Sequence, residues 1–557
     1  MNSFKKMISF LFSGENKGSK KKSGNVSGNE MDKMDISQLI EFTEGKNLSA
    51  SLSQNLSLIR KIYGNSFGLQ IREFRVGPGD NDAAMVFIEG MVDNASLEEK
   101  YKTLLVGITN KKEVPTKAQP LFDFIQDKLI ACSEVRDVTR VDEMFDQLLS
   151  GDTILLLDGV DMALVFGTKG FKTRSIMESE SETSIRGSRE SFIESLTDNL
   201  SLIRRRIKVP QLWVELYRVG SLTRTQVALV YIKGLVGEEI LEEFRTRISS
   251  IDTDSILESG QLETFIEDNP YTIFPLLLRT ERVDRTAAAL LEGQAAVLTD
   301  GSSFALLAPA TFFNMLNAPE DYFEKFPIGS FLRVLRYTAF LMSIFLPSIY
   351  VAVINFHPEL VPTQLLLRVA ATREGIPFPV IVEMVLMEAT FEVLREAGIR
   401  LPAAIGPAIS IVGALILGDA AIRAGIVSPP VVIIVALTAI ASFAVPNFAL
   451  GISGRMLRFG FLALGGIFGM FGIQIGAFLL IAHLCSLRSF GIPYMAPAAP
   501  MIVRDMKDFF ARVPNWTSST RPLLTGFREP VRQSQRQSRR YFKLPFPRKE
   551  GGEENGS

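Results

Sequence analysis

Residues 51–60 read SLSQNLSLIR, and residues 195–204 read SLTDNLSLIR. This match is the first of five that keep their order along the chain at an offset of about 143 residues. The other four pair residues 72–77 with 215–220, 86–92 with 230–236, 140–142 with 282–284, and 148–159 with 290–301. Chance similarity does not hold one offset over five blocks. The sequence therefore predicts two copies of one module, over residues 47–171 and 191–320.

Each copy has the pattern of a mixed α/β module. In the first copy, apolar residues recur at helical spacing over residues 52–62, and residues 69–74 and 84–88 have the patterns of strands. Asp-Gly at 158–159 and at 300–301 lies between apolar runs. This dipeptide tolerates the positive φ of a type I′ turn, so each module is expected to contain a hairpin near its end.

The duplicated half has none of the usual catalytic motifs. It contains no histidine, no Gly-Lys phosphate loop and no G-x-S-x-G motif, so we expect a binding and assembly module and not an enzyme. The whole chain has two cysteines and two histidines, which fits a reducing cytosol and argues against a metal site or a cofactor. Residues 1–46 have the composition of a basic disordered tail, and residues 172–190 that of a polar linker.

The second half is dominated by apolar residues. Five long apolar segments follow the second module, within a predicted helical membrane domain of residues 330–490. They cover residues 334–356, 377–397, 403–424, 427–450 and 456–487. The expected fold is thus multi-domain, with two duplicated α/β cytosolic modules followed by an all-α membrane domain of four or five transmembrane helices. A basic cytosolic tail, residues 491–557, completes the chain.

Positive charge predicts the orientation of these segments. Arg333 and Arg336 precede the first segment and many arginines follow the last, so both termini are expected in the cytosol. An even number of crossings is then required. Either the glutamate-rich second segment does not cross fully, or the fifth doubles back at its glycines. The first alternative leaves Arg455 and Arg458 on the outer side, which is a conflict.

Four acidic residues lie in or beside the apolar segments. They are Glu383, Glu388, Glu392 and Asp419. A carboxylate at the centre of a bilayer costs about 2.5 kcal/mol or more, so these groups must face protein, water or the interface. They either line a water-filled cation pore or pair with arginines and hold helices together. The arginines considered as partners are Arg368, Arg373, Arg395, Arg400 and Arg423.

Small residues mark the third segment as a packing surface. Gly406, Ser410, Gly413 and Gly418 recur at a spacing that lets helices approach closely without a hydrophobic driving force. In the fifth segment, His483 and Cys485 are interpreted as residues of helix packing.

Several longer motifs of the membrane half are similar to those of a known family. They read HPEL at 357–360, REGIPFP at 373–379, LREAG at 394–398, SIVGAL at 410–415 and SFGIPY at 489–494. Together with the NLSLIR repeats, they resemble the conserved sequence of GerA-type spore germinant receptor A subunits. The resemblance covers about residues 50–505.

This resemblance implies a role in spore germination. Such A subunits are expected in the spore inner membrane, with a permease-like B subunit that is thought to bind the nutrient, a lipoprotein C subunit and membrane lipid as partners. No nucleic-acid partner is expected. The subunits are thought to form ring-shaped homo-oligomeric cation channels that open when germinant binds.

Two other functions are compatible with the sequence. A secondary transporter usually shows inverted repeats within its membrane half, and here the duplication lies only in the soluble half. A non-conducting signalling scaffold, or a sporulation accessory paralogue of the same family, would use the duplicated modules for binding and the helices as anchors.

Overall fold

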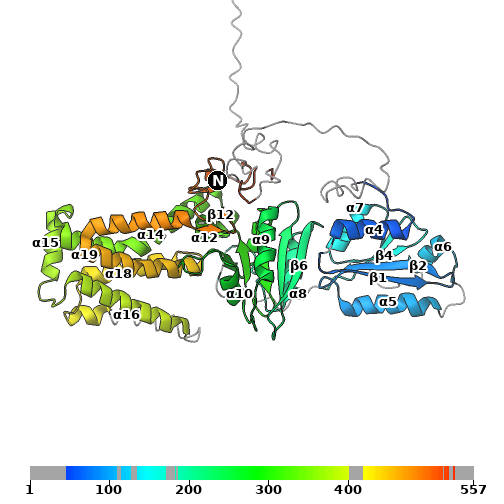
Figure 1. Ribbon diagram of the computed structural model, residues 1–557, viewed down its shortest axis with the longest axis horizontal. Helices are drawn as coiled ribbons and strands as arrows, with labels where there is room; N and C mark the ends of the chain where they lie inside the picture. Colours follow the sequence, from blue (N-terminus) through cyan, green and yellow to red (C-terminus); the bar gives the residue numbers. More distant parts are fainter. Residues whose placement is uncertain are drawn as a thin grey trace, which may run out of the picture.

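The computed structural model describes residues 45–64, 66–109, 114–126, 135–170, 182, 186–400, 418–517, 520–525 and 531–532. The molecule is elongated (Figure 1). Module 1 lies at one end, module 2 in the middle, and the helices of the apolar half at the other end.

Module 1 is a five-stranded antiparallel sheet with helices on both faces. Its strands lie in the order β1-β2-β4-β5-β3. The elements are α4 (Leu52–Tyr63), β1 (Leu69–Val76), β2 (Asn81–Ile88), α5 (Asn94–Thr109), α6 (Ala118–Phe124), β3 (Val135–Val138), α7 (Val141–Leu149), β4 (Thr153–Leu157) and β5 (Ala163–Phe166). In β2, Val86 packs with α4 and α7, whereas Met85 packs with α5 and α6. Burial on both faces explains why this strand is a continuous apolar run.

Module 2 repeats this architecture. Its strands lie in the equivalent order β6-β7-β9-β10-β8, so the predicted duplication of an α/β module is confirmed. The elements are α8 (Leu196–Arg206), β6 (Leu212–Val219), β7 (Thr225–Ile232), α9 (Glu238–Ser249), α10 (Ser259–Ile266), β8 (Leu278–Thr280), α11 (Val283–Leu291), β9 (Ala295–Thr299) and β10 (Ala305–Ala308).

The predicted hairpins β4–β5 and β9–β10 are present, but the predicted type I′ turn is wrong. Each loop is longer than two residues, and only the glycine of each Asp-Gly pair has a positive φ, +86° at Gly159 and +85° at Gly301. The aspartates have another role. A side-chain oxygen of Asp158 accepts a hydrogen bond from Leu52 N at 2.9 Å, and Asp300 accepts one from Leu196 N at 3.2 Å. Both therefore satisfy an amide at the start of their module's first helix.

The apolar half is helical. After α12 (Phe312–Leu316) and α13 (Glu320–Phe323) come α14 (Phe326–Phe356), η2 (Pro358–Leu360), α15 (Thr363–Thr372), α16 (Val380–Arg400), α18 (Pro429–Phe443) and α19 (Phe448–Ser486). Among the described residues, two helices, α14 and α19, are long and apolar enough to span a membrane.

The boundary between the last two predicted segments is corrected. The predicted fourth segment, residues 427–450, ends as a helix at Phe443. The side chain of Asn447 accepts a hydrogen bond from Leu450 N at 2.9 Å and begins α19, which is longer at its start than predicted. Pro446 has no amide hydrogen to continue the preceding helix.

α19 is a helical hairpin. Gly469 has φ +62° and ψ −147°, a conformation that is essentially restricted to glycine. A Cβ built on Gly476 would lie 2.8 Å from Phe461 Cε1, although these residues would be about 22 Å apart along a continuous helix. The chain therefore reverses at Gly469, as in the second alternative of the sequence analysis.

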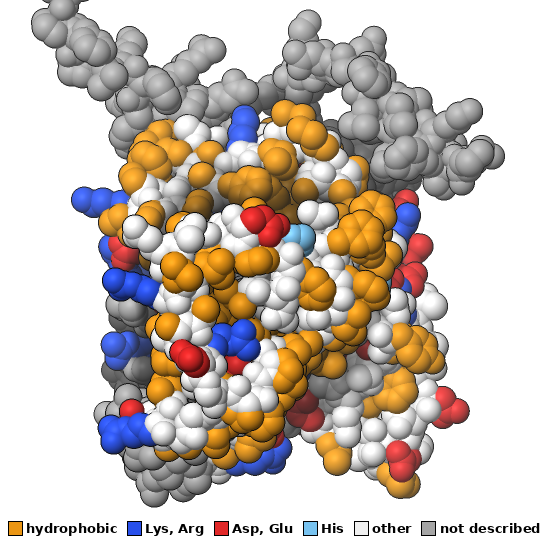
Figure 2. Space-filling model, turned by 90° about the vertical axis from the view of Figure 1, so that its left-hand side faces the viewer, with side chains coloured by type: hydrophobic (Ala, Val, Ile, Leu, Met, Phe, Trp, Pro, Cys, Tyr) orange, Lys and Arg blue, Asp and Glu red, His pale blue; other side chains and the backbone are white. Residues whose placement is uncertain are grey.

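The helices lie lengthwise beside one another. Gly454 lies against Phe340 and Gly469 against Phe356, so the first arm of α19 runs parallel to α14. α16 runs the other way and packs against α14, α18 and α19 along its length, which favours a lengthwise helix over an interfacial one. Figure 2 views the end of this bundle that is farthest from the modules, where hydrophobic and uncharged side chains predominate.

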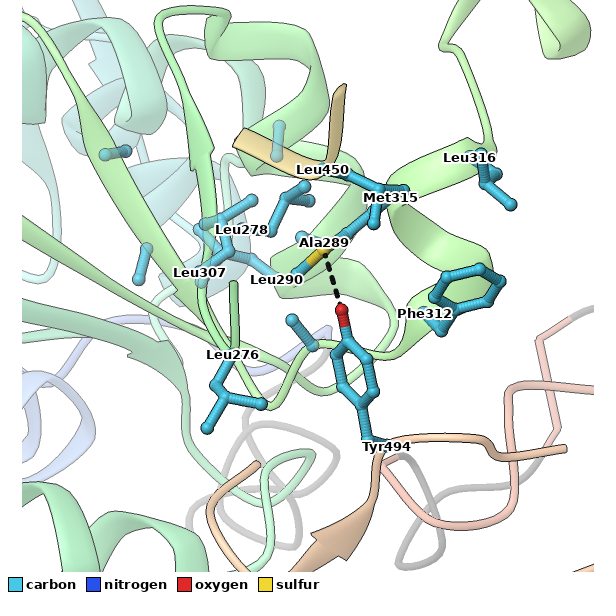
Figure 3. Packing of buried hydrophobic residues seen from close by; sticks show 14 of the residues in the cluster. Leu276, Leu278, Ala289, Leu290, Leu307, Phe312, Met315, Leu316, Leu450 and Tyr494 are labelled. Carbon is cyan, nitrogen blue, oxygen red and sulfur yellow. Dashed lines mark hydrogen bonds between the residues drawn. The ribbon is translucent and has the colours of Figure 1, made fainter. Parts of the chain in front are cut away.

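Module 2 and the bundle share one hydrophobic core (Figure 3). Leu307 of β10, Met315 of α12 and Leu450 of α19 contribute to it. Tyr494, which follows α19, donates a hydrogen bond to Met315 Sδ at 3.4 Å. The short strands β11 (Arg488–Ser489) and β12 (Ile492–Pro493) also dock here, a contact that was not predicted for the region after the last helix.

Candidate functional site

Glu388 and Arg458 form a buried ion pair inside the bundle. Glu388 Oε2 on α16 lies 2.5 Å from Arg458 Nη1 on α19, and both residues are at most 2% exposed. Arg458 Nε also donates to the Ser343 carbonyl of α14 at 2.7 Å. One ion pair thus joins three helices. Glu388 Oε1 and Arg458 Nη2 have no hydrogen-bond partner in the part of the chain that the structure describes.

Glu383 is bound at the end of the bundle that is distant from the modules. Glu383 is 1% exposed to solvent. One oxygen lies 3.3 Å from Arg373 Nη2, and the other accepts from Ser428 N at 2.8 Å and Ser428 Oγ at 2.7 Å. Glu383 therefore connects the start of α16 with the start of α18.

Glu392 forms a third pair towards the modules. One of its oxygens lies 2.6 Å from Arg455 Nη1 on α19. One turn further along α16, Arg395 donates to Ser442 Oγ at 2.5 Å and stacks over the ring of Phe443 at 4.3 Å. We call the pairs Glu383–Arg373, Glu388–Arg458 and Glu392–Arg455 the Glu–Arg ladder.

The ladder favours pairing over open pore lining for these three acids within one chain. Each carboxylate has an arginine within 3.3 Å. Glu383 and Glu388 are buried and need such a partner, whereas Glu392 is partly exposed. Arg373 was among the predicted partners, whereas Arg455 and Arg458 were not. They are three residues apart on one helix and face Glu392 and Glu388, which are four apart on an antiparallel helix. That spacing could have predicted the two pairs from the sequence.

The remaining predicted site residues lie elsewhere. Asp419 pairs with Arg423 at 2.9 Å, and both side chains are more than half exposed. A Cβ on Gly418 would lie 3.4 Å from Val432 of α18, in agreement with close packing at this position. Gly406, Ser410 and Gly413 lie outside the described residues.

His483 and Cys485 have no role in the ladder. His483 Nε2 lies 3.1 Å from Thr272 Oγ1 of module 2, and Cys485 is an exposed free thiol. Among the described residues, no group of three His, Cys, Asp or Glu side chains is placed to hold a metal ion.

A second charged cluster, which was not predicted, lies where module 2 meets α14. Asp321 is fully buried and accepts from Arg333 at 3.4 Å and from Arg336. Arg333 also donates to Asp508 Oδ1 at 2.9 Å. Tyr322 donates to the other Asp508 oxygen at 2.6 Å. We call these five residues the collar.

The collar connects module 2 firmly to the bundle. It ties the end of module 2, the first turns of α14 and the segment after β12 to one set of charges. Arg512 adds hydrogen bonds to the carbonyls of Asp321 and Glu324, both at 2.6 Å. Movement of module 2 relative to α14 would require several of these contacts to break together.

The chain belongs to the GerA family, because the family model described as Bacillus/Clostridium GerA spore germination protein matches residues 57–524. Among its relatives, spore germination protein KA of Bacillus subtilis (strain 168) is 45% identical over 491 residues, which are 88% of this chain and 89% of the relative. Spore germination protein GerLA of Bacillus cereus is 38% identical, over 85% of this chain and 96% of the relative.

A solved structure is also similar to this chain. It is the N-terminal domain of the A subunit of the Bacillus megaterium spore germinant receptor GerK3. The sequences are 36% identical, the match covers 48% of this chain and 98% of the domain, and the TM-score is 0.39.

Proposed function

We propose that this chain is a membrane subunit of a nutrient germinant receptor, and that its oligomer conducts cations when germinant binds. It would act without catalysis, together with a permease-like B subunit and a lipoprotein C subunit. The observation that supports the receptor role is the match to the GerA family over residues 57–524.

The proposed arrangement in the spore inner membrane is multi-pass, with the modules and both termini on the cytosolic side. Support comes from the direction of the described helices. α14 leaves module 2, and both arms of α19 have an end at module 2, since Ser453 donates to the Ile273 carbonyl and His483 contacts Thr272. The α19 hairpin begins and ends on the side of the modules. This fits an even number of membrane crossings.

The proposed cation path uses an acid whose ion pair is open to solvent. The ladder acids are each paired, so they are proposed to hold α16 in place at bilayer depth. Asp419 is more exposed, with a side chain 58% accessible beside Arg423. In an oligomer it would be available to water or to a neighbouring copy, where a ring of carboxylates favours cations.

The test is potassium release from spores, recorded with a potassium electrode during exposure to a panel of nutrients. Deletion of the chain should abolish release for at least one nutrient. Asp419→Lys should reduce that release, and Asp419→Asn should reduce it less, at unchanged protein level. Unchanged release in the deletion strain for every nutrient would contradict the receptor role. Normal release with Asp419→Lys would contradict the role of Asp419 alone.

A further inference from the structure

The first helix and edge strand of module 2 form a face that is covered by module 1. Phe67 N donates to the Val214 carbonyl at 2.9 Å, and Val214 N donates to Ser66 Oγ at 3.0 Å. Arg204, which is buried, donates to the Phe67 carbonyl. A loop of module 1 thus makes hydrogen bonds to the outer edge of β6.

Glycines of module 1 make this contact close. A Cβ on Gly90 would lie 2.9 Å from Thr197 Cγ2, and one on Gly68 would lie 2.5 Å from Arg204 Nη1. Both glycines have positive φ. The face of module 2 therefore lies in close contact with the backbone of module 1.

The duplication gives module 1 the same face, and there it is open. In the repeat, Ser57 corresponds to Ser201, Arg60 to Arg204 and Ile71 to Val214. Ser57 is exposed whereas Ser201 is half-buried, and the Arg60 side chain is 60% exposed whereas Arg204 is buried. The face contains a groove of about 460 Å³ lined by Ser53, Leu56, Ser57, Arg60, Lys61 and Glu73.

The edge strand beside this groove is also uncovered. β1 is the terminal strand of its sheet, and among the described residues no backbone hydrogen bond reaches Ile71 from outside the sheet. An exposed edge strand of this length is a ready site for another polypeptide.

The direction of the face indicates what can reach it. In Figure 1, β1 and α4 run along the long axis of the molecule, as α18 and α19 do. The free edge of β1 therefore faces sideways. If α14 and α19 cross a membrane, the long axis lies across that membrane and the groove faces a neighbouring molecule at the same height.

We propose that the α4–β1 groove of module 1 is the contact site for a second copy of this chain, whose module 1 adds a backbone segment to β1 beside Arg60. This inference rests on the proposed oligomer and specifies one of its interfaces. A groove on one copy that binds a different surface of the next gives a head-to-tail contact, which forms a ring when the rotation between successive copies closes.

The test uses the photo-crosslinking residue p-benzoylphenylalanine in place of Ser57, in cells that express two differently tagged copies of the full chain. We expect a crosslinked product that carries both tags. The probe at Glu98, an exposed residue of α5, is the matched control and should give none. The probe at Ser201 should crosslink only within one chain, because module 1 covers it.

A blocking variant makes the test independent of probe chemistry. With the probe at Ser53, the substitution Ser57→Trp should remove most of the product that carries both tags. If the two tagged copies co-purify but the probes at Ser57 and Ser53 capture no second copy, this interface is wrong and the oligomer stands. Failure of the tagged copies to co-purify would overturn both the interface and the oligomer.

Discussion

At the scale of single residues, substitution within the Glu388–Arg458 pair should lower the free energy of unfolding strongly. Both charges are removed from solvent and each still has one unpartnered polar atom among the described residues. Removal of one member of a buried pair leaves the other charge uncompensated, which typically costs about 3 kcal/mol or more.

We therefore predict that Arg458→Met lowers the free energy of unfolding by about 3 kcal/mol. Thermal unfolding of the purified chain in detergent would measure this. The double variant Glu388→Gln/Arg458→Met should recover part of the loss, because no unpaired charge remains. Asp419→Asn is the control: its exposed i,i+4 pair should be worth about 0.5 kcal/mol or less. Equal losses for Arg458→Met and Asp419→Asn would contradict the ladder.

Glu267 gives a prediction for pH. Burial, together with Glu263 and Asp268, raises the pKa of Glu267 from its ordinary value to about 7. The folded state then holds a proton that the unfolded state loses near pH 4.5, so stability contributed by this group is present at low pH and is lost as pH rises towards 7.

Glu267→Gln should flatten this part of the stability profile and make the chain more stable than the parent at pH 8. Thermal unfolding between pH 5 and 8 is the measurement. A parent and variant with parallel pH profiles would show that Glu267 titrates normally.

At the scale of elements, the reversal within α19 depends on Gly469. Its φ of +62° with ψ −147° is not available to other residues without strain, and a Cβ there would lie 3.0 Å from Phe356. Gly469→Ala should destabilise the chain by about 1–3 kcal/mol. Gly460→Ala in the same helix, where a Cβ meets nothing within 4 Å, should be neutral or stabilising by up to about 1 kcal/mol.

Thermal unfolding in detergent compares the two variants directly. If Gly469→Ala and Gly460→Ala behave alike, residues 448–486 do not form a hairpin at Gly469.

Features that depend on local sequence patterns were predicted, and features that depend on long-range contacts were not. The duplication, the buried strands and the hairpins follow from local patterns, and they were predicted. The role of Asp158, the end of the fourth apolar segment at Phe443 and the pairing of Arg458 were not. Each depends on a contact between residues that are distant in sequence, or on a cap that competes with an uninterrupted apolar run. The choice between four crossings and a reversal at Gly469 was open because several glycines compete in that segment.

At the scale of the whole molecule, the collar couples the modules to the bundle. Asp321→Ala would leave Arg333 and Arg336 without their shared carboxylate at a fully buried position. We predict faster limited proteolysis between module 2 and α14, with cleavage near residues 317–325. Asp161→Ala in an exposed loop of module 1 is the control and should leave the rate unchanged. An unchanged rate for Asp321→Ala would show that the shared hydrophobic core alone holds the joint.

In the proposed arrangement, the bundle crosses a membrane with the modules on one side and the turn of α19 on the other. Labelling of single cysteines with a membrane-impermeant maleimide in intact cells tests it most directly, after replacement of Cys132 and Cys485 by serine. Leu367→Cys on α15 and Phe468→Cys beside the turn should be labelled from outside, and both side chains are exposed. Tyr271→Cys in module 2, 95% exposed, should react only after the cells are lysed. Labelling of Tyr271→Cys in intact cells would contradict this arrangement. So would the absence of labelling of Leu367→Cys and Phe468→Cys until lysis.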